Sequence, residues 1–114
     1  MTEDPLFRPL SIRSLSLPNR VVMTTVKLGY GTQDGEVTGR HMAFYTRRAA
    51  GRVGLLTTES LYVTGNGKEL PTQMGVHDDA LVPGLESLVR AVHAAGGRIM
   101  AHINHAGRAA NPRL

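Results

Sequence analysis

RIMAHINHAGR, residues 98–108, is the stretch of this sequence that best indicates the fold. Its first half is apolar, and its second half gathers the polar side chains of His102, Asn104, His105 and Arg108. A short buried strand that runs directly into a polar tip is typical of α/β enzymes, whose sites lie at the carboxyl ends of parallel strands. We therefore predict a strand over residues 98–104 and a polar loop after it.

Two earlier segments show the same apolar pattern. Residues 21–26 (VVMTTV) and 53–59 (VGLLTTE) are short runs without a break, and the second ends at a carboxylate and a serine, Glu59 and Ser60. Continuous rather than alternating apolar character is typical of strands covered on both faces, as in parallel sheets. Three buried strands are predicted in all.

Two helices are predicted between these strands. The first begins after Thr38, whose hydroxyl can cap it, and ends at Gly51. The second begins at Asp78 or Asp79 and stops at Gly96-Gly97. Each has an apolar stripe at helical spacing, formed by Met42, Tyr45 and Ala49 in the first and by Leu81, Leu85, Leu88, Val92 and Ala95 in the second.

The segments after the first two strands are polar and rich in glycine. In residues 27–37 a turn is expected at Asp34-Gly35, and in residues 64–75 another at Gly65-Asn66-Gly67. Residues 27–37 match neither a P-loop nor a dinucleotide-binding motif, and Gly65-Asn66-Gly67 is a weak phosphate-loop candidate but a strong turn candidate. We interpret both as loops that join a strand to a helix.

This order of strands and helices implies a parallel sheet with right-handed crossovers. An open doubly wound sheet and a (β/α)8 barrel both fit it. Long loops after the strands and short glycine turns after the helices favour the barrel, whose active face is built from strand-to-helix loops. Before the first strand, residues 6–17 are expected to form two short extended arms joined by a turn.

The composition is that of a globular protein, and a cytoplasmic one is expected. Of 114 residues, 41% are hydrophobic and 19% charged, and the lack of cysteine excludes disulfides, thiolate metal sites and cysteine nucleophiles within them. Residues 1–10 do not resemble a signal peptide, and no apolar run approaches the roughly 18 residues of a membrane helix. We treat residues 1–114 as one unit without an internal domain boundary.

The formal net charge of +4 raises the question of nucleic-acid binding. The basic residues are scattered along the chain, however, and only Arg47 and Arg48 are adjacent. No run of aromatic residues is interleaved with them to stack bases. We therefore expect neither nucleic acid nor a membrane as a partner.

Four stretches resemble the Old Yellow Enzyme family. They are LFRPLSIRSLSLPNRVVM (6–23), DGEVTGRHMAFYTRRAAGRVGLLTTE (34–59), MGVHDDALVPGLESLVRAVHAAGGRI (74–99) and HINHAGR (102–108). The likeness is closer to the NADH:flavin oxidoreductase branch, which includes 2,4-dienoyl-CoA reductase and trimethylamine dehydrogenase. It implies that this α/β chain is the N-terminal segment of a TIM barrel, about three strands and two helices, in which FMN binds non-covalently at the carboxyl ends of the strands.

The resemblance also implies cofactor-binding positions. Ser60 matches a small residue near the flavin ring, and His102 stands where many members have a glutamine bonded to the flavin's pyrimidine edge. Tyr30 lies near a tyrosine that contacts substrate in some members. The segment that lies along the flavin is matched by Thr24, Thr25, Val26 and Lys27.

Lys27 and His102 each have two interpretations. Lys27 stands where the family has a threonine or cysteine facing flavin O4 and N5, and it excludes the cysteine tether of trimethylamine dehydrogenase-like members. Its cation would raise the reduction potential of the flavin, unless it points into solvent. His102, grouped by strand alternation with Met100 and Asn104, bonds the flavin edge or is satisfied by barrel-interior neighbours.

Three further residues are also open to two interpretations. His105 and Arg108 either shape their loop or meet substrate, and Glu59 is a general base or a structural hydrogen-bond acceptor. His102 and His105 lie three residues apart on an extended segment and point to opposite faces, so no metal site is expected.

The activity implied by the resemblance is transfer of hydride from NAD(P)H through FMN to an activated alkene of the enoate, enone or dienoyl type. Oxidation of an amine or ether is the alternative within the family. A non-catalytic barrel fragment that serves as a structural or assembly subunit is the alternative of another class.

The family's remaining parts are expected beyond residue 114. They include the substrate-binding His/Asn or His/His pair, the proton-donating tyrosine, the phosphate site and, in longer members, cysteines that hold a 4Fe-4S cluster. No catalytic residue is therefore expected in this segment, which should be inactive alone. Because three strands cannot close an eight-stranded barrel, we expect the remainder of the barrel or a complementary chain as a partner, and a homo-oligomer.

Overall fold

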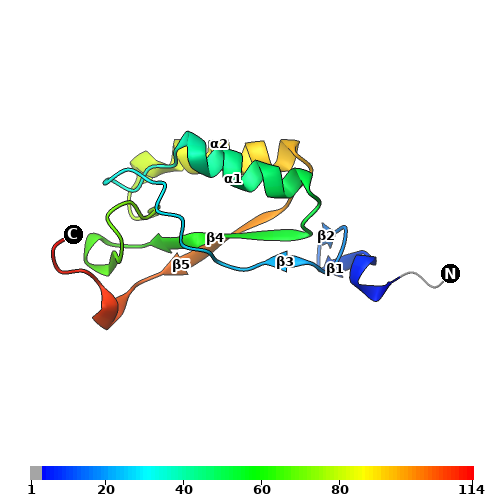
Figure 1. Cartoon of the computed structure of the whole chain (residues 1–114), viewed down its shortest axis with the longest axis horizontal. Coiled ribbons are helices and arrows are strands. Elements are labelled where there is room, and N and C mark those ends of the chain that lie inside the picture. The colour runs from blue at the N-terminus through cyan, green and yellow to red at the C-terminus, as the bar shows by residue number, and fades with distance from the viewer. Residues whose placement is uncertain (1–3) are drawn as a thin grey trace.

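The computed structural model describes residues 4–114 and shows a sheet covered by two helices, with a hairpin at one end (Figure 1). Residues 1–3, part of the stretch judged not to be a signal peptide, lie outside the described residues. In chain order the elements are β1 (Leu10–Ile12), β2 (Leu15–Leu17), β3 (Val22–Met23), α1 (Gly39–Ala50), β4 (Leu55–Tyr62), α2 (Val82–Ala94) and β5 (Ile99–Asn104). The 3-10 turns are Pro5–Phe7, Gly65–Gly67, Asp79–Leu81 and Gly107–Ala109.

The main sheet is parallel and has the order β3-β4-β5. Helix α1 connects β3 to β4, α2 connects β4 to β5, and both helices cover the same face (Figure 1). The predicted alternation of strands and helices is confirmed. A strand order that advances in one direction with its helices on one face is the arrangement of a barrel, whereas doubly wound sheets carry helices on both faces.

The hydrophobic core lies between the helices and the sheet. The predicted stripes supply it, because Tyr45 and Ala49 of α1 and Leu88 and Val92 of α2 are buried there. The remaining predicted stripe positions are buried or packed against this core. The sheet and the second loop contribute Leu56, Leu61 and Met74.

The helix boundaries agree with the sequence. Thr38 is the N-cap of α1 and Gly51 its C-cap. The Asp78 carboxylate accepts the Ala80 N–H at 2.8 Å and so caps the 3-10 turn that leads into α2. After α2 the chain passes through Gly96, whose φ of 88° is a conformation that favours glycine. No helix within residues 4–114 has the length and apolar character needed to cross a membrane.

Two strand boundaries differ from the prediction. β3 pairs with β4 at Val22 and Met23 rather than over residues 21–26, and this ladder stops just before Thr57, where the register of β4 with β5 begins to shift. β4 runs to Tyr62 rather than ending at residue 59, because its last residues pair with β5 beyond that shift. β5 agrees with the prediction to within one residue.

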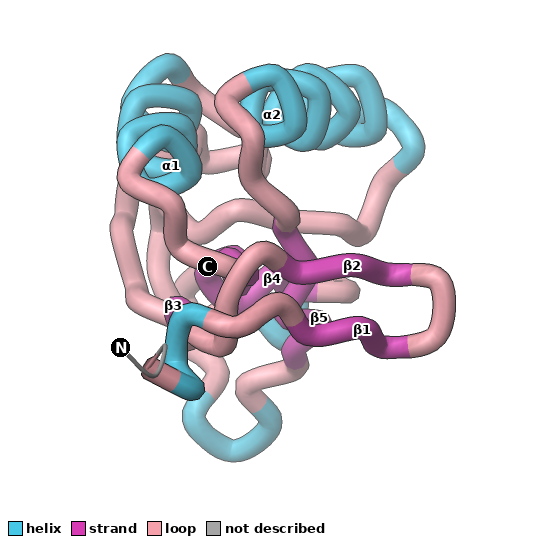
Figure 2. The backbone as a smooth tube through the Cα atoms, turned by 90° about the vertical axis from the view of Figure 1, so that its right-hand side faces the viewer, coloured by secondary structure: helices cyan, strands magenta, loops and turns pink. Residues whose placement is uncertain are grey.

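The arms predicted in residues 6–17 form an antiparallel hairpin of β1 and β2, with Leu10 opposite Leu17. The turn between them includes Arg13 at a φ of 52°. The hairpin lies at the amino ends of the main-sheet strands, at the end of the molecule opposite the long loops (Figures 1 and 2).

The second face of the main sheet, which we term the open face, carries no α-helix within residues 4–114 (Figure 1). Met23 and Ile99 pack against the core, so their strand neighbours Val22 and Met100 point to the open face. These two side chains are 46% and 45% exposed.

The molecule is more extended than a compact domain of this length. Its radius of gyration is 15.4 Å, whereas a compact domain would have about 13 Å.

Candidate functional site at the carboxyl ends of the strands

The carboxyl ends of β3, β4 and β5 lie at one end of the molecule, together with the loops that follow them (Figure 1). In barrel enzymes this end carries the site. Here the chain brings together four polar residues, Thr25, Thr58, Ser60 and His102, which we term the carboxyl-end cluster.

His102 is held by contacts from two other segments. Its ring Nδ1 lies 2.7 Å from Thr25 Oγ1, and its main-chain N–H donates to Thr58 Oγ1 at 3.0 Å. Thr58 in turn donates its hydroxyl hydrogen to the Glu59 carbonyl at 2.8 Å. The His102 side chain is half-buried, and Nε2 is its remaining ring nitrogen. Within residues 4–114, Nδ1 has a hydrogen-bond partner and Nε2 has none.

A β-bulge decides which way the end of β4 points. Between Thr57 and Ser60 the register with β5 shifts, so that two residues of β4 lie opposite one of β5. Glu59 then points to the helices, while Ser60 is paired with His102 and lies on the open face. Ser60 is thus inside β4 rather than at its end, and its carbonyl accepts a hydrogen bond from Gln73 Nε2 at 2.8 Å.

Of the two roles considered for Glu59, general base and structural hydrogen-bond acceptor, its surroundings fit the second. Its carboxylate is buried beneath α1, with Oε1 2.6 Å from His41 Nε2, and the two side chains are 1% and 0% exposed. His41 Nδ1 accepts the main-chain N–H of Thr38 at 3.0 Å, so the ring hydrogen is on Nε2 and is donated to Glu59. A carboxylate buried in this way has no access to a substrate.

Tyr45 completes this buried pairing. Its phenol oxygen accepts the Glu59 main-chain N–H at 2.7 Å. Burial raises the pKa of Tyr45 to about 12, since the phenolate would be desolvated there and would also lie close to the Glu59 carboxylate. We missed the role of His41 in the sequence, although its place three residues after the cap Thr38 is the position from which a side chain can bond back to the cap.

The segment predicted to lie along the flavin is mostly accessible. Thr24, Val26 and Lys27 are exposed, and Thr25 is half-buried against His102. The Lys27 ammonium is 2.5 Å from Glu69 Oε1 in the second loop, and the lysine side chain is 57% exposed. Lys27 is therefore neither buried nor unpaired, and its cation is partly compensated by a carboxylate.

The Tyr30 side chain packs against residues of the first turns of α1. Its ring meets the edges of His41 and Phe44, and the Arg40 guanidinium stands 4.0 Å above it. Its carbonyl accepts the Thr38 hydroxyl at 2.7 Å. These contacts fix the ring on the helix side of the loop.

His105 and Arg108 lie in the exposed turn after β5. His105 Nδ1 accepts the Gly107 N–H at 2.9 Å, and its ring packs so closely on Gly67 that a Cβ there would come within 2.6 Å of it. His105 thus shapes the loop, one of its two predicted roles. Arg108 is exposed in the 3-10 turn Gly107–Ala109.

The loops after β3 and β4 are tied to each other. Gly31 N–H donates to the Thr72 carbonyl at 2.9 Å, and the Thr72 hydroxyl donates to the Gly29 carbonyl at 3.0 Å. Lys68 is 7% exposed, and its ammonium donates to the Gln33 carbonyl at 2.5 Å. We missed Lys68 in the sequence because a single lysine in a glycine-rich loop gives no local sign that it is buried.

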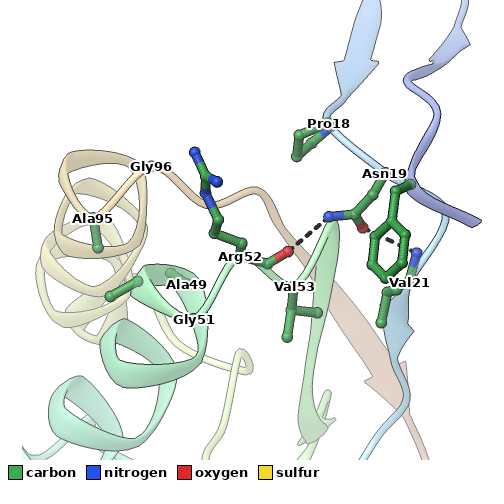
Figure 3. Close-up of a pocket in the computed structure, with 11 residues that line it drawn as sticks. Pro18, Asn19, Val21, Ala49, Gly51, Arg52, Val53, Ala95 and Gly96 are labelled. Atoms are coloured by element: carbon green, nitrogen blue, oxygen red, sulfur yellow. Dashed lines mark hydrogen bonds between the residues drawn. The ribbon is translucent and has the colours of Figure 1, made fainter. Parts of the chain in front are cut away.

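A large surface hollow lies away from this cluster, between the hairpin and the carboxyl ends of both helices (Figure 3). It has a volume of about 840 Å³ and is lined by residues such as Pro18, Asn19 and Gly96. Asn19 is committed to structure there, with its Nδ2 donating to the Arg52 carbonyl at 2.7 Å. Because it lies at the amino ends of the strands, the hollow does not belong to the carboxyl-end cluster.

Parallel strands with helices on one face, and polar residues gathered at the carboxyl ends, define a segment of a β/α-barrel protein. Residues 5–113 match the model of the NADH:flavin oxidoreductase / NADH oxidase family, and the chain belongs to this family. The resemblance seen in the sequence is thereby confirmed.

Solved structures of Old Yellow Enzyme relatives are similar over nearly the whole chain. Old Yellow Enzyme from Pichia sp. AKU4542 is 28% identical with a TM-score of 0.91, covering 96% of this chain and 28% of that one. Morphinone reductase in complex with tetrahydroNAD is 34% identical with a TM-score of 0.85, covering 95% of this chain and 29% of that one. A complex of 2-naphthoyl-CoA reductase with 2-naphthoyl-CoA is 27% identical with a TM-score of 0.90, covering 94% and 16%.

These likenesses confirm the predicted fold, the N-terminal segment of a TIM barrel. The chain spans less than a third of the length of each of these relatives. Their activities therefore belong to polypeptides with a whole barrel, of which this chain corresponds to the first strands and helices.

Proposed function

We propose that this chain forms part of an FMN-dependent oxidoreductase that passes hydride from NAD(P)H to an activated alkene of the enoate, enone or dienoyl type. The observation that carries the proposal is the carboxyl-end cluster, in which one ring nitrogen of His102 has no partner within residues 4–114, at the end of a family barrel where sites are built.

Relatives support the two reactants. Morphinone reductase binds tetrahydroNAD, and 2-naphthoyl-CoA reductase binds 2-naphthoyl-CoA, an unsaturated acyl thioester. The family is described as NADH:flavin oxidoreductases. A nicotinamide donor, a flavin carrier and an unsaturated acceptor together fit the proposed reaction better than oxidation of an amine or ether.

The residues at the carboxyl ends suit a flavin. An isoalloxazine ring needs hydrogen-bonding groups at its polar edge and a flat, mostly apolar surface elsewhere. Residues 24–27 offer an accessible extended segment, and His102 and Ser60 lie on the same face of neighbouring strands. When bound, FMN supplies reversible hydride transfer, while the role of these residues is to bind and orient it.

The proposed enzyme needs the rest of its barrel. Both outer strands of the main sheet, β3 and β5, have one edge unpaired within residues 4–114, and the open face exposes Val22 and Met100. Such edges and faces are covered in stable proteins. We propose that the remainder of the barrel, in the same polypeptide or in a complementary chain, covers them, and that this segment alone is inactive.

A visible absorption spectrum tests the proposal. The protein at its native length is expected to show bound flavin bands that bleach anaerobically when NADH or NADPH is added and return when an enone is supplied. Bleaching by an amine or ether without a nicotinamide would favour the oxidative alternative. A colourless protein that does not take up added FMN would contradict the flavoenzyme and leave a structural subunit.

A further inference from the structure

The contact between Thr25 and His102 joins segments that do not pair with each other. β4 lies between β3 and β5. Even so, Thr25 Oγ1 and His102 Nδ1, 77 positions apart in the chain, are separated by 2.7 Å. This is the distance of a short hydrogen bond, and Thr58 separately fixes the main chain of His102. The chain itself therefore defines both the position and the rotation of the imidazole ring.

The contacts of Thr25 also indicate where the ring hydrogen lies. Within residues 4–114 the Thr25 hydroxyl makes its hydrogen bond to His102 alone. If Nδ1 donated its hydrogen to the hydroxyl oxygen, the hydroxyl hydrogen of this half-buried threonine would have no acceptor in those residues. If the hydroxyl donates to Nδ1, its hydrogen is bonded and the ring hydrogen is on Nε2.

We propose that Thr25 is a positioning residue that holds His102 in its Nε2–H tautomer, so that this N–H donates a hydrogen bond to a carbonyl oxygen of the flavin. The identity of the ligand rests on the proposed function, whereas the tautomer does not depend on it. The pyrimidine edge of a flavin carries two carbonyl oxygens, which accept hydrogen bonds. A ring with Nε2 fixed as a donor is complementary to them and repels a donor presented at the same place.

Nuclear magnetic resonance of the protein labelled with ¹⁵N-histidine tests the tautomer directly, because the nitrogen shifts of a neutral imidazole distinguish Nδ1–H from Nε2–H. The native-length protein is expected to show His102 as Nε2–H before FMN is added. Thr25→Val, which removes the hydroxyl at constant shape, is expected to give a mixture of tautomers. Thr25→Ser is expected to restore the single form.

Titration with FMN tests the consequence. Loss of one positioned hydrogen bond predicts that Thr25→Val binds FMN about threefold to tenfold more weakly than the wild-type protein. Thr25→Ser is expected to bind within about twofold of wild type, because its hydroxyl still reaches Nδ1. Ser87→Ala, which removes an exposed hydroxyl bonded to the Pro83 carbonyl on α2, is the matched control and should change neither measurement.

Two results would overturn the inference. One is a wild-type His102 found as Nδ1–H, and the other is a Thr25→Val variant whose tautomer and FMN affinity both equal those of wild type. A protein that binds no FMN would instead remove the proposed function, and with it the ligand assigned to Nε2. The tautomer spectra would still decide whether Thr25 positions the ring.

Discussion

His41 and His102 lie on opposite faces of the main sheet, and their surroundings differ. His41, on the face covered by the helices, is fully buried and has both ring nitrogens bonded within the chain, to Thr38 and Glu59. His102, on the open face, is half-buried and has one ring nitrogen bonded within the chain, to Thr25.

The contrast shows how to separate structural from functional polar residues in this chain. A buried ring with both nitrogens occupied has no hydrogen-bonding capacity left for a ligand, so its contribution is to stability. A half-buried ring that is oriented by one bond within residues 4–114 keeps a nitrogen for a ligand, which is the role that we propose for His102. Four tests by substitution examine this separation, beginning with the largest expected effect.

Removing the Glu59 carboxylate should be the most damaging change. Glu59→Ala leaves the neutral His41 Nε2–H without its acceptor in a site that is 0% exposed and also opens a cavity beneath α1, so we expect the free energy of unfolding in urea to fall by about 3–5 kcal/mol. Glu59→Gln keeps an oxygen that can accept this hydrogen and should cost about 1 kcal/mol. Equal losses in the two variants would argue against the neutral His41 donor.

A pair of truncations compares the two faces. Leu56→Ala, at a residue 0% exposed on the covered face, should lower the free energy of unfolding by about 3 kcal/mol. Met100→Ala, on the open face, should cost about 2 kcal/mol in the native-length protein, because the rest of the barrel is proposed to cover it. Val89→Ala on α2 is the control and should cost less than about 0.5 kcal/mol. A Met100 loss as small as the control would mean that the open face stays exposed.

Tyr45→Phe tests how the stability that Tyr45 contributes on the covered face depends on pH. The variant leaves the buried Glu59 N–H without an acceptor, at a cost of about 1–3 kcal/mol at neutral pH. The pKa of Tyr45 is raised from 10.0 to about 12, so above pH 10 the unfolded chain loses this proton before the folded protein does. Stability held by Tyr45 is therefore complete below pH 10 and is lost as the pH rises towards 12.

The difference in unfolding free energy between wild type and Tyr45→Phe should accordingly shrink over that interval. Urea unfolding at a series of pH values measures it. A difference that stays constant from pH 10 to 12 would show that the phenol is not protected from ionisation in the folded protein.

Lys27→Thr should have the smallest effect on stability, below about 1 kcal/mol, because its ion pair with Glu69 is mostly exposed. We propose that its cation raises the flavin potential, so the variant should lower the potential measured by a redox titration. Glu69→Gln, which removes the compensating carboxylate, should shift it the other way. An unchanged potential in Lys27→Thr would remove Lys27 from cofactor tuning.

Local patterns predicted the framework of this fold. Thr38, Gly51 and Asp78 mark helix ends through their own conformational preferences, and the apolar stripes follow from helical spacing. Only the sheet register determines where a strand ends, so β4 was predicted to stop three residues too soon, at Glu59.

The candidate site was less predictable because its contacts are long-range. Thr25 and His102 lie 77 positions apart, and Lys27 and Glu69 lie 42 apart. No periodicity within a strand or helix encodes such pairs. The direction of Glu59 also depends on a bulge that a run of small and β-branched residues does not reveal.

The bonds between the loops after β3 and β4 have a consequence for engineering. With Gly31 and Gln33 on one loop tied to Thr72 and Lys68 on the other, the two segments form a single module. Gly35 reinforces this, because its carbonyl accepts the Gly75 N–H at 2.9 Å. To graft a different specificity onto this scaffold, both loops must be exchanged together, since a single transplanted loop would lose its anchors.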